Sequence, residues 1–125
     1  MTVYLCGGIN GLTDSAAKGW REEAKKSLLC KTLDPMRRDY RGVEDQNVEA
    51  IVSGDIQDIE RSDALLVNAN RPSWGTAMEI HFAALLRKPV YAFCSGRVSP
   101  WLRFHCTEVL TTMADCIGRL NRFAE

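Results

Sequence analysis

The sequence predicts one α/β domain over residues 1–125, with a five-stranded parallel sheet covered by helices on both faces. Short apolar runs of strand length alternate along the chain with longer segments whose apolar residues recur at helical spacing. This alternation is typical of parallel strands joined by crossover helices. A chain of 125 residues fits one domain, and it contains no internal repeat, low-complexity segment or linker.

The first half of the chain contains two expected strands and two expected helices. They are a strand at 3–6, a helix from 13 or 14 to about 29, a strand at 32–33 and a helix at 48–61. Gly7-Gly8 ends the first strand in a tight loop, and Pro35 ends the second because proline cannot donate to a strand ladder. The segment 37–46 is polar and irregular, and Asp58 is expected to be exposed.

The second half continues the same alternation. Its expected elements are a strand at 64–67, a helix at 75–86, a strand at 89–93, a short helix near Trp101, a weak strand near Val109 and a last helix at 112–123. The run Ala64-Leu-Leu-Val67 is the clearest buried strand of the chain.

The charge balance and the cysteines limit the classes of partner. The 16 basic and 16 acidic residues cancel, so nothing favours nucleic acid or an anionic membrane. No apolar run approaches the roughly 20 residues of a membrane span, and the apolar N-terminus is too short for a signal peptide. The five cysteines form no C-x-x-C pair, which argues against a zinc site. We expect reduced thiols, no metal, no cofactor and a cytoplasmic location.

Functional residues are expected where the carboxyl ends of the parallel strands meet, because ligands of open α/β sheets bind there. Gly7 and Gly8 form either a tight turn or a close approach for a ligand. The glycine spacing does not match a dinucleotide loop, and there is no Walker A sequence. Two histidines and no G-x-S-x-G elbow give little support to a Ser–His–Asp relay. Arg37, Arg38 and Arg41 form either a solvated loop or a source of one phosphate ligand.

Two carboxylates remain, Glu79 and Asp55, and the residues alone leave two interpretations open. Glu79 either closes a capping box with Thr76 or acts chemically. Asp55 is either an exposed helix position or a second active carboxylate. If both face the strand edge, the pair suits glycosidic chemistry, in which one carboxylate attacks an anomeric carbon and another group manages the leaving group's proton.

Four stretches of the chain resemble the nucleoside 2-deoxyribosyltransferase family and its related nucleotide N-glycosidases. They are Val3-Tyr-Leu-Cys-Gly-Gly8, Leu33-Asp-Pro-Met36 with Tyr40-Arg-Gly42, Asp55 with Ser62-Asp-Ala64, and Pro72-Ser-Trp-Gly-Thr-Ala-Met-Glu79. The resemblance implies a flavodoxin-like, doubly wound sheet and a homo-oligomer whose active sites are completed by a neighbouring subunit.

The resemblance also implies a role for each matching residue. Glu79 corresponds to the nucleophile that forms a covalent deoxyribosyl ester, Asp55 handles the proton of the base, and Tyr4 orients the nucleophile. The N-terminus of the helix is expected to keep Glu79 ionised. The substrate-binding positions are Gly7, Gly8, Asp34, Met36, Arg37, Ser73, Trp74, Gly75 and Ser99, the last from a neighbouring subunit.

Ser73 bears on the subtype. The transferases that act on free nucleosides resemble one another in having Asp at this position, which binds the sugar 5′-hydroxyl. The nucleotide N-glycosidases have Ser there, placed to receive a 5′-phosphate that Asp would repel. The stretches 33–36 and 40–42 look closer to the transferases, and Met36 at the base-contacting position leaves the base preference open.

The sequence therefore predicts an enzyme that breaks the N-glycosidic bond of a 2′-deoxyribonucleoside or its 5′-monophosphate and passes the sugar to another nucleobase. Transfer of the sugar to water, as in a nucleotide N-glycosidase, is nearly equally favoured. A non-catalytic nucleotide-binding module on the same fold is the alternative of another class. The expected partners are the nucleoside or nucleotide, an acceptor base and further copies of the chain.

Overall fold

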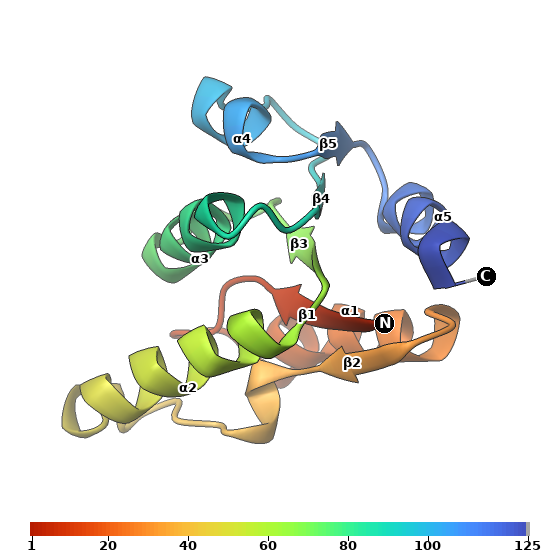
Figure 1. The fold of residues 1–125 in the computed structure, drawn as a ribbon. Helices are drawn as coiled ribbons and strands as arrows, with labels where there is room; N and C mark the ends of the chain where they lie inside the picture. The colour runs from red at the N-terminus through yellow and green to blue at the C-terminus, as the bar shows by residue number, and fades with distance from the viewer. Residues whose placement is uncertain (125) are drawn as a thin grey trace.

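The computed structural model describes residues 1–124 and contains one five-stranded parallel sheet (Figure 1). The strands are β1 (Thr2–Cys6), β2 (Lys31–Leu33), β3 (Ala64–Asn68), β4 (Val90–Phe93) and β5 (Glu108–Leu110). Their order across the sheet is β2-β1-β3-β4-β5, and each neighbouring pair runs parallel. The predicted α/β fold class with a doubly wound sheet is confirmed.

Helices cover both faces of this sheet. They are α1 (Asp14–Ser27), α2 (Val48–Arg61), α3 (Trp74–Leu85), α4 (Pro100–His105) and α5 (Met113–Ala124). Helices α2, α3 and α4 lie on one face, and α1 and α5 lie on the other (Figure 1). The segment expected to be irregular contains two short 3-10 helices, η1 (Pro35–Arg37) and η2 (Glu44–Gln46). Within residues 1–124, no helix has the length and apolar character that crossing a bilayer requires.

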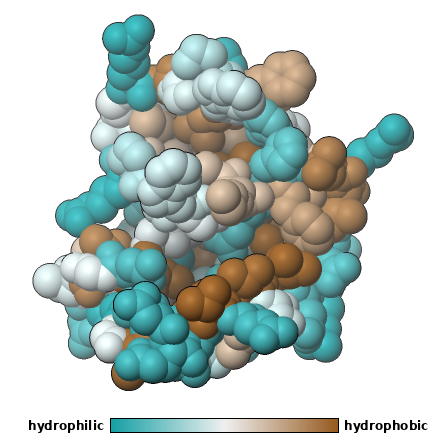
Figure 2. Space-filling view, turned by 90° about the vertical axis from the view of Figure 1, so that its left-hand side faces the viewer, coloured by the Kyte–Doolittle hydropathy of each residue, from teal (hydrophilic) through white to brown (hydrophobic). Residues whose placement is uncertain are grey.

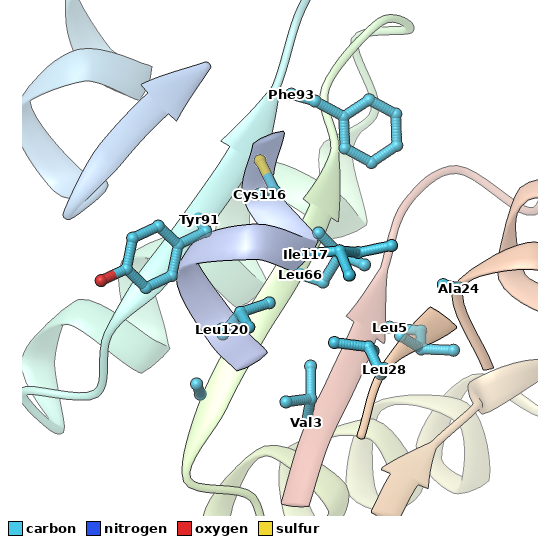
Figure 3. Close-up of a cluster of buried hydrophobic side chains, with 11 residues drawn as sticks. Val3, Leu5, Ala24, Leu28, Leu66, Tyr91, Phe93, Cys116, Ile117 and Leu120 are labelled. Atoms are coloured by element: carbon cyan, nitrogen blue, oxygen red, sulfur yellow. The ribbon is translucent and has the colours of Figure 1, made fainter. Parts of the chain in front are cut away.

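The core consists of two apolar layers, one on each face of the sheet. On the α1/α5 side, Cys116, Ile117 and Leu120 of α5 pack onto side chains of the central strands (Figure 3). The other layer joins β1, β3 and β4 to α2, α3 and α4. Successive side chains of a strand point to opposite faces. Strand β1 therefore directs Tyr4 and Cys6 toward the α2/α3 side, where both are buried.

The strand order predicts where a ligand binds in this fold. The chain leaves β1 through α1 to reach β2 on one side, and β3 lies on the other side of β1. The connections thus diverge between β1 and β3, and this switch point opens a crevice at the carboxyl ends of the strands.

Helix α2 differs from its sequence-based prediction. Its apolar residues Val48, Val52 and Ile56 are exposed, and only Ile59 is fully buried. Figure 2 looks onto the face that carries α2, α3 and α4, and hydrophobic side chains form a row across part of it. The expectation that Asp58 is exposed is wrong: its side chain is 1% exposed, because two arginines cover it.

Candidate active site

A polar cavity opens at the switch point, between the end of β1 and helices α2 and α3. Gly7, Arg38, Asp55, Ser73, Thr76 and Glu79 are among the residues that line it. Its volume is about 120 Å³, less than the 300–1,000 Å³ of ordinary ligand pockets. A ligand as large as a nucleoside would therefore extend beyond this cavity. Throughout the text this space is called the polar cavity.

Glu79 is fixed by two side chains of β1. The Tyr4 hydroxyl donates to Glu79 Oε2 at 2.5 Å, and the Cys6 thiol donates to Oε1 at 3.5 Å. Because Tyr4 and Cys6 are two positions apart on a strand, both point to the same face. Both oxygens of the carboxylate are thus held by one strand, and the carboxyl group is presented to the polar cavity.

Glu79 is not part of a capping box. The N-cap of α3 is Ser73, whose hydroxyl accepts from the Thr76 amide at 3.3 Å. The expected cap at Thr76 is wrong, because the helix begins at Trp74 rather than later. Glu79 therefore lies beyond the first turn, where the helix dipole has little effect.

The two carboxylates of the polar cavity favour a bound proton. Burial, and then the negative charge of Asp55, raise the pKa of Glu79 to about 7, although the hydrogen bonds from Tyr4 and Cys6 oppose the rise. Burial also raises the pKa of Asp55, and the hydrogen bond from Arg38 offsets this only in part. The structure does not support the expectation that the helix N-terminus keeps Glu79 ionised, because Glu79 lies beyond the first turn of α3 and its pKa is raised. A carboxyl group with a pKa near neutrality is suited to acid–base catalysis, whereas a carboxylate nucleophile reacts in its ionised form.

Asp55 is held by a network of charged side chains. Nη2 of Arg38 donates to Asp55 Oδ1 at 3.2 Å and to Asp58 Oδ2 at 2.7 Å. Asp58 also accepts hydrogen bonds from Nη1 and Nη2 of Arg37, at 2.8 and 2.7 Å. Burial alone raises the pKa of Asp58, but the two arginines outweigh it and lower the pKa overall. Asp58 is thus the ionised anchor that positions Arg38 beside Asp55.

A buried arginine supports the loop after β1. Arg21 is wholly buried and donates to the carbonyls of Leu5, Gly7 and Ala17. These contacts satisfy carbonyls at the end of the strand that holds Glu79. A Cβ at Gly7 would lie 2.8 Å from Cζ2 of Trp20, so this position needs glycine for packing against α1.

The N-terminus of α3 forms one wall of the polar cavity. Ser73, Gly75 and Thr76 line it. The Thr76 side chain is buried, and its Oγ1 is the one buried side-chain polar atom without a hydrogen-bond partner among the described residues. Backbone amides at a helix N-terminus together with an unpaired hydroxyl are suited to binding an anion.

The structure does not bring all the sequence-predicted residues into the polar cavity. Asp34 is buried and accepts from the Met36 amide at 2.8 Å, and Lys25 lies 2.6 Å from its carboxylate. Met36 is buried beside it, and neither residue lines the polar cavity. Arg37 also lies outside, because Asp58 holds its guanidinium. Gly8 lies next to Ser73 but lines a separate cleft.

Trp74 and Ser99 line a second feature, an apolar groove between α3 and α4. Ala77, Met78, Ile80 and Leu102 also line this α3–α4 groove, which has a volume of about 640 Å³. Trp74 is 85% exposed, and Ser99 caps α4 by accepting from the Trp101 amide. Thr76 lines both the α3–α4 groove and the polar cavity, so the two features share a wall.

Sequence analysis gave no role in the site to Cys6 and Arg21, considered Arg38 only as a candidate phosphate ligand or part of a solvated loop, and considered Thr76 only as a helix cap. Cys6 contacts Glu79, Arg38 contacts Asp55, Arg21 supports the loop after β1, and Thr76 lines the wall. For Arg21 a signal existed, because it shares a helix face with Ala17, Ala24 and Leu28, and a charge on an apolar face is unusual. The other three need the tertiary structure.

Comparisons with known proteins identify the family and the fold. The model of the nucleoside 2-deoxyribosyltransferase family matches residues 3–105. One matching solved structure is a 2-deoxyribosyltransferase from the psychrotolerant bacterium Bacillus psychrosaccharolyticus. Its TM-score is 0.74 at 17% identity, over 92% of this chain and 89% of that chain. At this identity the likeness establishes the fold. A comparison with curated proteins gave no match. Because the family match spans most of the sequence, the chain belongs to the nucleoside 2-deoxyribosyltransferase family.

Proposed function

We propose that the protein cleaves the N-glycosidic bond of a 2′-deoxyribonucleoside or its 5′-monophosphate through a covalent deoxyribosyl–Glu79 ester and passes the sugar to another nucleobase. The observation that carries this proposal is the position of Glu79. It is held by Tyr4 and Cys6 in a cavity that it shares with Asp55. Two carboxyl groups beside one substrate are the arrangement used by retaining glycosidases.

Glu79 and Asp55 titrate as a coupled pair, and the reacting form of the pair is the one in which Asp55 carries the proton. In the first half-reaction, the ionised Glu79 attacks C1′ of the sugar. The C1′–N bond breaks, its electron pair stays with the base, and the protonated Asp55 gives its proton to the base. An ester between Glu79 and C1′ is formed. The Tyr4 hydroxyl holds Oε2 during this step, which keeps the carboxylate oriented.

In the second half-reaction, a ring nitrogen of a second base attacks C1′ of the ester. Asp55, now ionised, accepts the proton that this nitrogen loses, and Glu79 leaves as a carboxylate. Asp55 thus gives one proton in the first half-reaction and takes one back in the second. Burial raises the pKa of Asp55, which favours its protonated form. Water in place of the second base gives the free sugar and makes the enzyme a hydrolase.

Hydrolysis of a 5′-monophosphate is the second candidate, and the α3 N-terminus favours a phosphate. Ser73, Gly75 and the unpaired Thr76 hydroxyl line the polar cavity there. An anion at this position receives backbone N–H groups and the positive end of the helix dipole. We therefore propose that the 5′ group of the substrate lies against Ser73.

We also propose that the working unit is a homo-oligomer. The polar cavity is too small for a nucleoside, and one wall of it continues into the α3–α4 groove. Exposed apolar residues gather on α2, α3 and α4, including Val52, Met78 and Trp101. A second copy on this face buries them and adds walls to the site.

One assay tests the reaction. The protein is incubated with 2′-deoxynucleosides and their 5′-monophosphates, each with and without an acceptor base, and the products are separated by chromatography. A new nucleoside only when acceptor is present supports transfer, and free base without acceptor supports hydrolysis. Rapid acid quenching of wild type with substrate and no acceptor base, followed by mass spectrometry of the peptide that contains Glu79, tests the ester. No product with any substrate favours the non-catalytic binding module.

A further inference from the structure

Arg38 and Asp55 lie side by side in the polar cavity. Both line the cavity, and Nη2 of Arg38 holds Asp55 Oδ1 at 3.2 Å. Among the described residues, no hydrogen bond engages Asp55 Oδ2 or the Nη1 and Nε atoms of Arg38. Asp55 Oδ2 and Nη1 of Arg38 are therefore left for a ligand, whereas Nε of Arg38 lies against Gly54 of α2.

Arg38 is held rigidly in this position. Its Nη2 is anchored 2.7 Å from Oδ2 of the buried Asp58. On α2, Gly54 leaves the space that the guanidinium occupies, since a Cβ there would lie 2.9 Å from Nε. A donor that cannot retreat favours a base with an acceptor at this place and penalises a base with a donor there.

The chemistry of the leaving base indicates which atom of the base faces the Arg38 guanidinium. If Asp55 Oδ2 carries the proton that the departing base receives, the base presents an acceptor to it. Arg38, bonded to the other oxygen of the same carboxyl group, then faces the neighbouring atom on the same edge of the base. In guanine and hypoxanthine, N7 and O6 are adjacent acceptors, whereas adenine has a donor amino group beside N7.

We infer that Arg38 is a specificity-determining residue that selects 6-oxopurines over 6-aminopurines in the reaction proposed above. In this arrangement Asp55 Oδ2 gives its proton to N7 while an N–H of Arg38 donates to O6 without transferring its proton. The C1′–N9 electron pair moves into the ring, and the base leaves neutral. With adenine, the 6-amino group directs its hydrogens at the guanidinium of Arg38. Two hydrogen-bond donors then face each other and neither has an acceptor.

The test uses a substrate pair that differs only at C6, 2′-deoxyinosine and 2′-deoxyadenosine, each also as the 5′-monophosphate. We expect wild type to have a kcat/KM about ten- to a hundredfold higher for the oxo member of each pair. Arg38→Met is expected to bring this ratio close to one, while Arg38→Lys keeps part of it. The matched control is Arg37→Met, which removes a neighbouring arginine from the same anchor Asp58 but lies outside the polar cavity. This variant is expected to keep the ratio.

A binding measurement separates failure of this inference from failure of the proposed reaction. Calorimetric titration of wild type and Arg38→Met with the free bases hypoxanthine and adenine needs no turnover. Tighter binding of hypoxanthine to wild type, lost in Arg38→Met, supports the inference even if no substrate is cleaved. The inference is overturned if wild type treats the two bases alike or binds neither. It is also overturned if Arg38→Met weakens both equally and leaves the ratio unchanged.

Discussion

The polar cavity and the α3–α4 groove share the wall at Thr76, yet they are built on opposite principles. In the polar cavity, Tyr4, Cys6 and Arg38 hold the acidic groups with specific hydrogen bonds. In the α3–α4 groove, Trp74, Met78 and Trp101 are exposed with little to cover them. The polar cavity is thus shaped by hydrogen bonds, whereas the groove is an apolar surface that water covers poorly.

The comparison shows that side chains are held by hydrogen bonds in the polar cavity, whereas apolar side chains are left exposed in the α3–α4 groove. Catalytic groups need fixed geometry before the substrate arrives, and the hydrogen bonds from Tyr4, Cys6 and Arg38 supply it in the polar cavity. An apolar groove needs only a complementary surface, which a second copy can supply. The predictions below disturb one region and monitor the other.

The largest effect is expected from Glu79→Gln. Glutamine keeps the shape of the side chain but cannot form the ester, so turnover is expected to fall by at least about three powers of ten. Steady-state kinetics with a deoxynucleoside and its monophosphate measures the loss, and sedimentation is expected to be unchanged. Residual activity above about a tenth of wild type would remove Glu79 from the role of nucleophile.

Met78→Asp tests the α3–α4 groove, and the property it is expected to change is assembly. A charge placed among the lining residues of the α3–α4 groove is expected to prevent assembly, because an unpaired carboxylate is costly to bury in an apolar interface. Analytical ultracentrifugation measures the molar mass. The control is Leu29→Asp, since Leu29 is 68% exposed and Met78 is 67% exposed, but Leu29 follows α1 on the other face of the sheet. If both variants have the mass of wild type, this groove is not the subunit interface.

The raised pKa of Glu79 predicts a dependence of stability on pH. Its pKa is about 7 in the folded protein against an ordinary value of 4.5, so the folded state binds this proton more tightly. The resulting stabilisation is complete below about pH 4.5 and is lost as the pH rises through about 7. The change amounts to about 3 kcal/mol, shared with Asp55 to the extent that the two carboxyl groups titrate together.

Urea unfolding of wild type and Glu79→Gln across this pH range measures the effect. The difference in unfolding free energy between the two proteins is expected to change in favour of the variant as the pH rises. A difference that is constant with pH would mean that Glu79 has an ordinary pKa.

Ser73→Asp tests the 5′ end of the substrate. Aspartate is also a good N-cap, so α3 is expected to keep its start. The added negative charge is expected to lower kcat/KM for a deoxynucleoside monophosphate about ten- to a hundredfold, and to leave or raise that for the free nucleoside. Kinetics on one nucleoside and its monophosphate gives the comparison. An equal loss on both substrates would show that Ser73 does not contact the phosphate.

The smallest effect is expected from Thr76→Val, at the wall between the two regions. Valine has nearly the same shape and removes the hydroxyl that lacks a partner among the described residues. The variant is expected to gain about 1 kcal/mol of unfolding free energy without ligand and to lose affinity for the monophosphate. Thermal or urea unfolding checks the first part, and kinetics checks the second. A loss of stability would mean that the assembled protein gives this hydroxyl a partner.

The sequence by itself determined the order and type of the elements. Apolar runs and helical periodicity locate five strands and five helices close to where they lie, because strands of a buried parallel sheet and amphipathic helices have different periods. The period of two also places Tyr4 and Cys6 on one face of β1. The family follows from short stretches around the strand ends, since those loops carry the residues that contact ligands in this fold.

Only the tertiary structure decided which side chains meet. Of the arginines after β2, Arg38 and Arg41 line the polar cavity and Arg37 does not, because the tight turn of η1 sends neighbouring side chains in different directions. The apolar stripe of α2 faces outward, since the same helix uses Asp55 and Asp58 to bind Arg38. The cap of α3 moved from Thr76 to Ser73, and Glu79 acquired its raised pKa from burial and from Asp55. These outcomes depend on how elements distant in sequence dock against one another, and local periodicity contains no information about that docking.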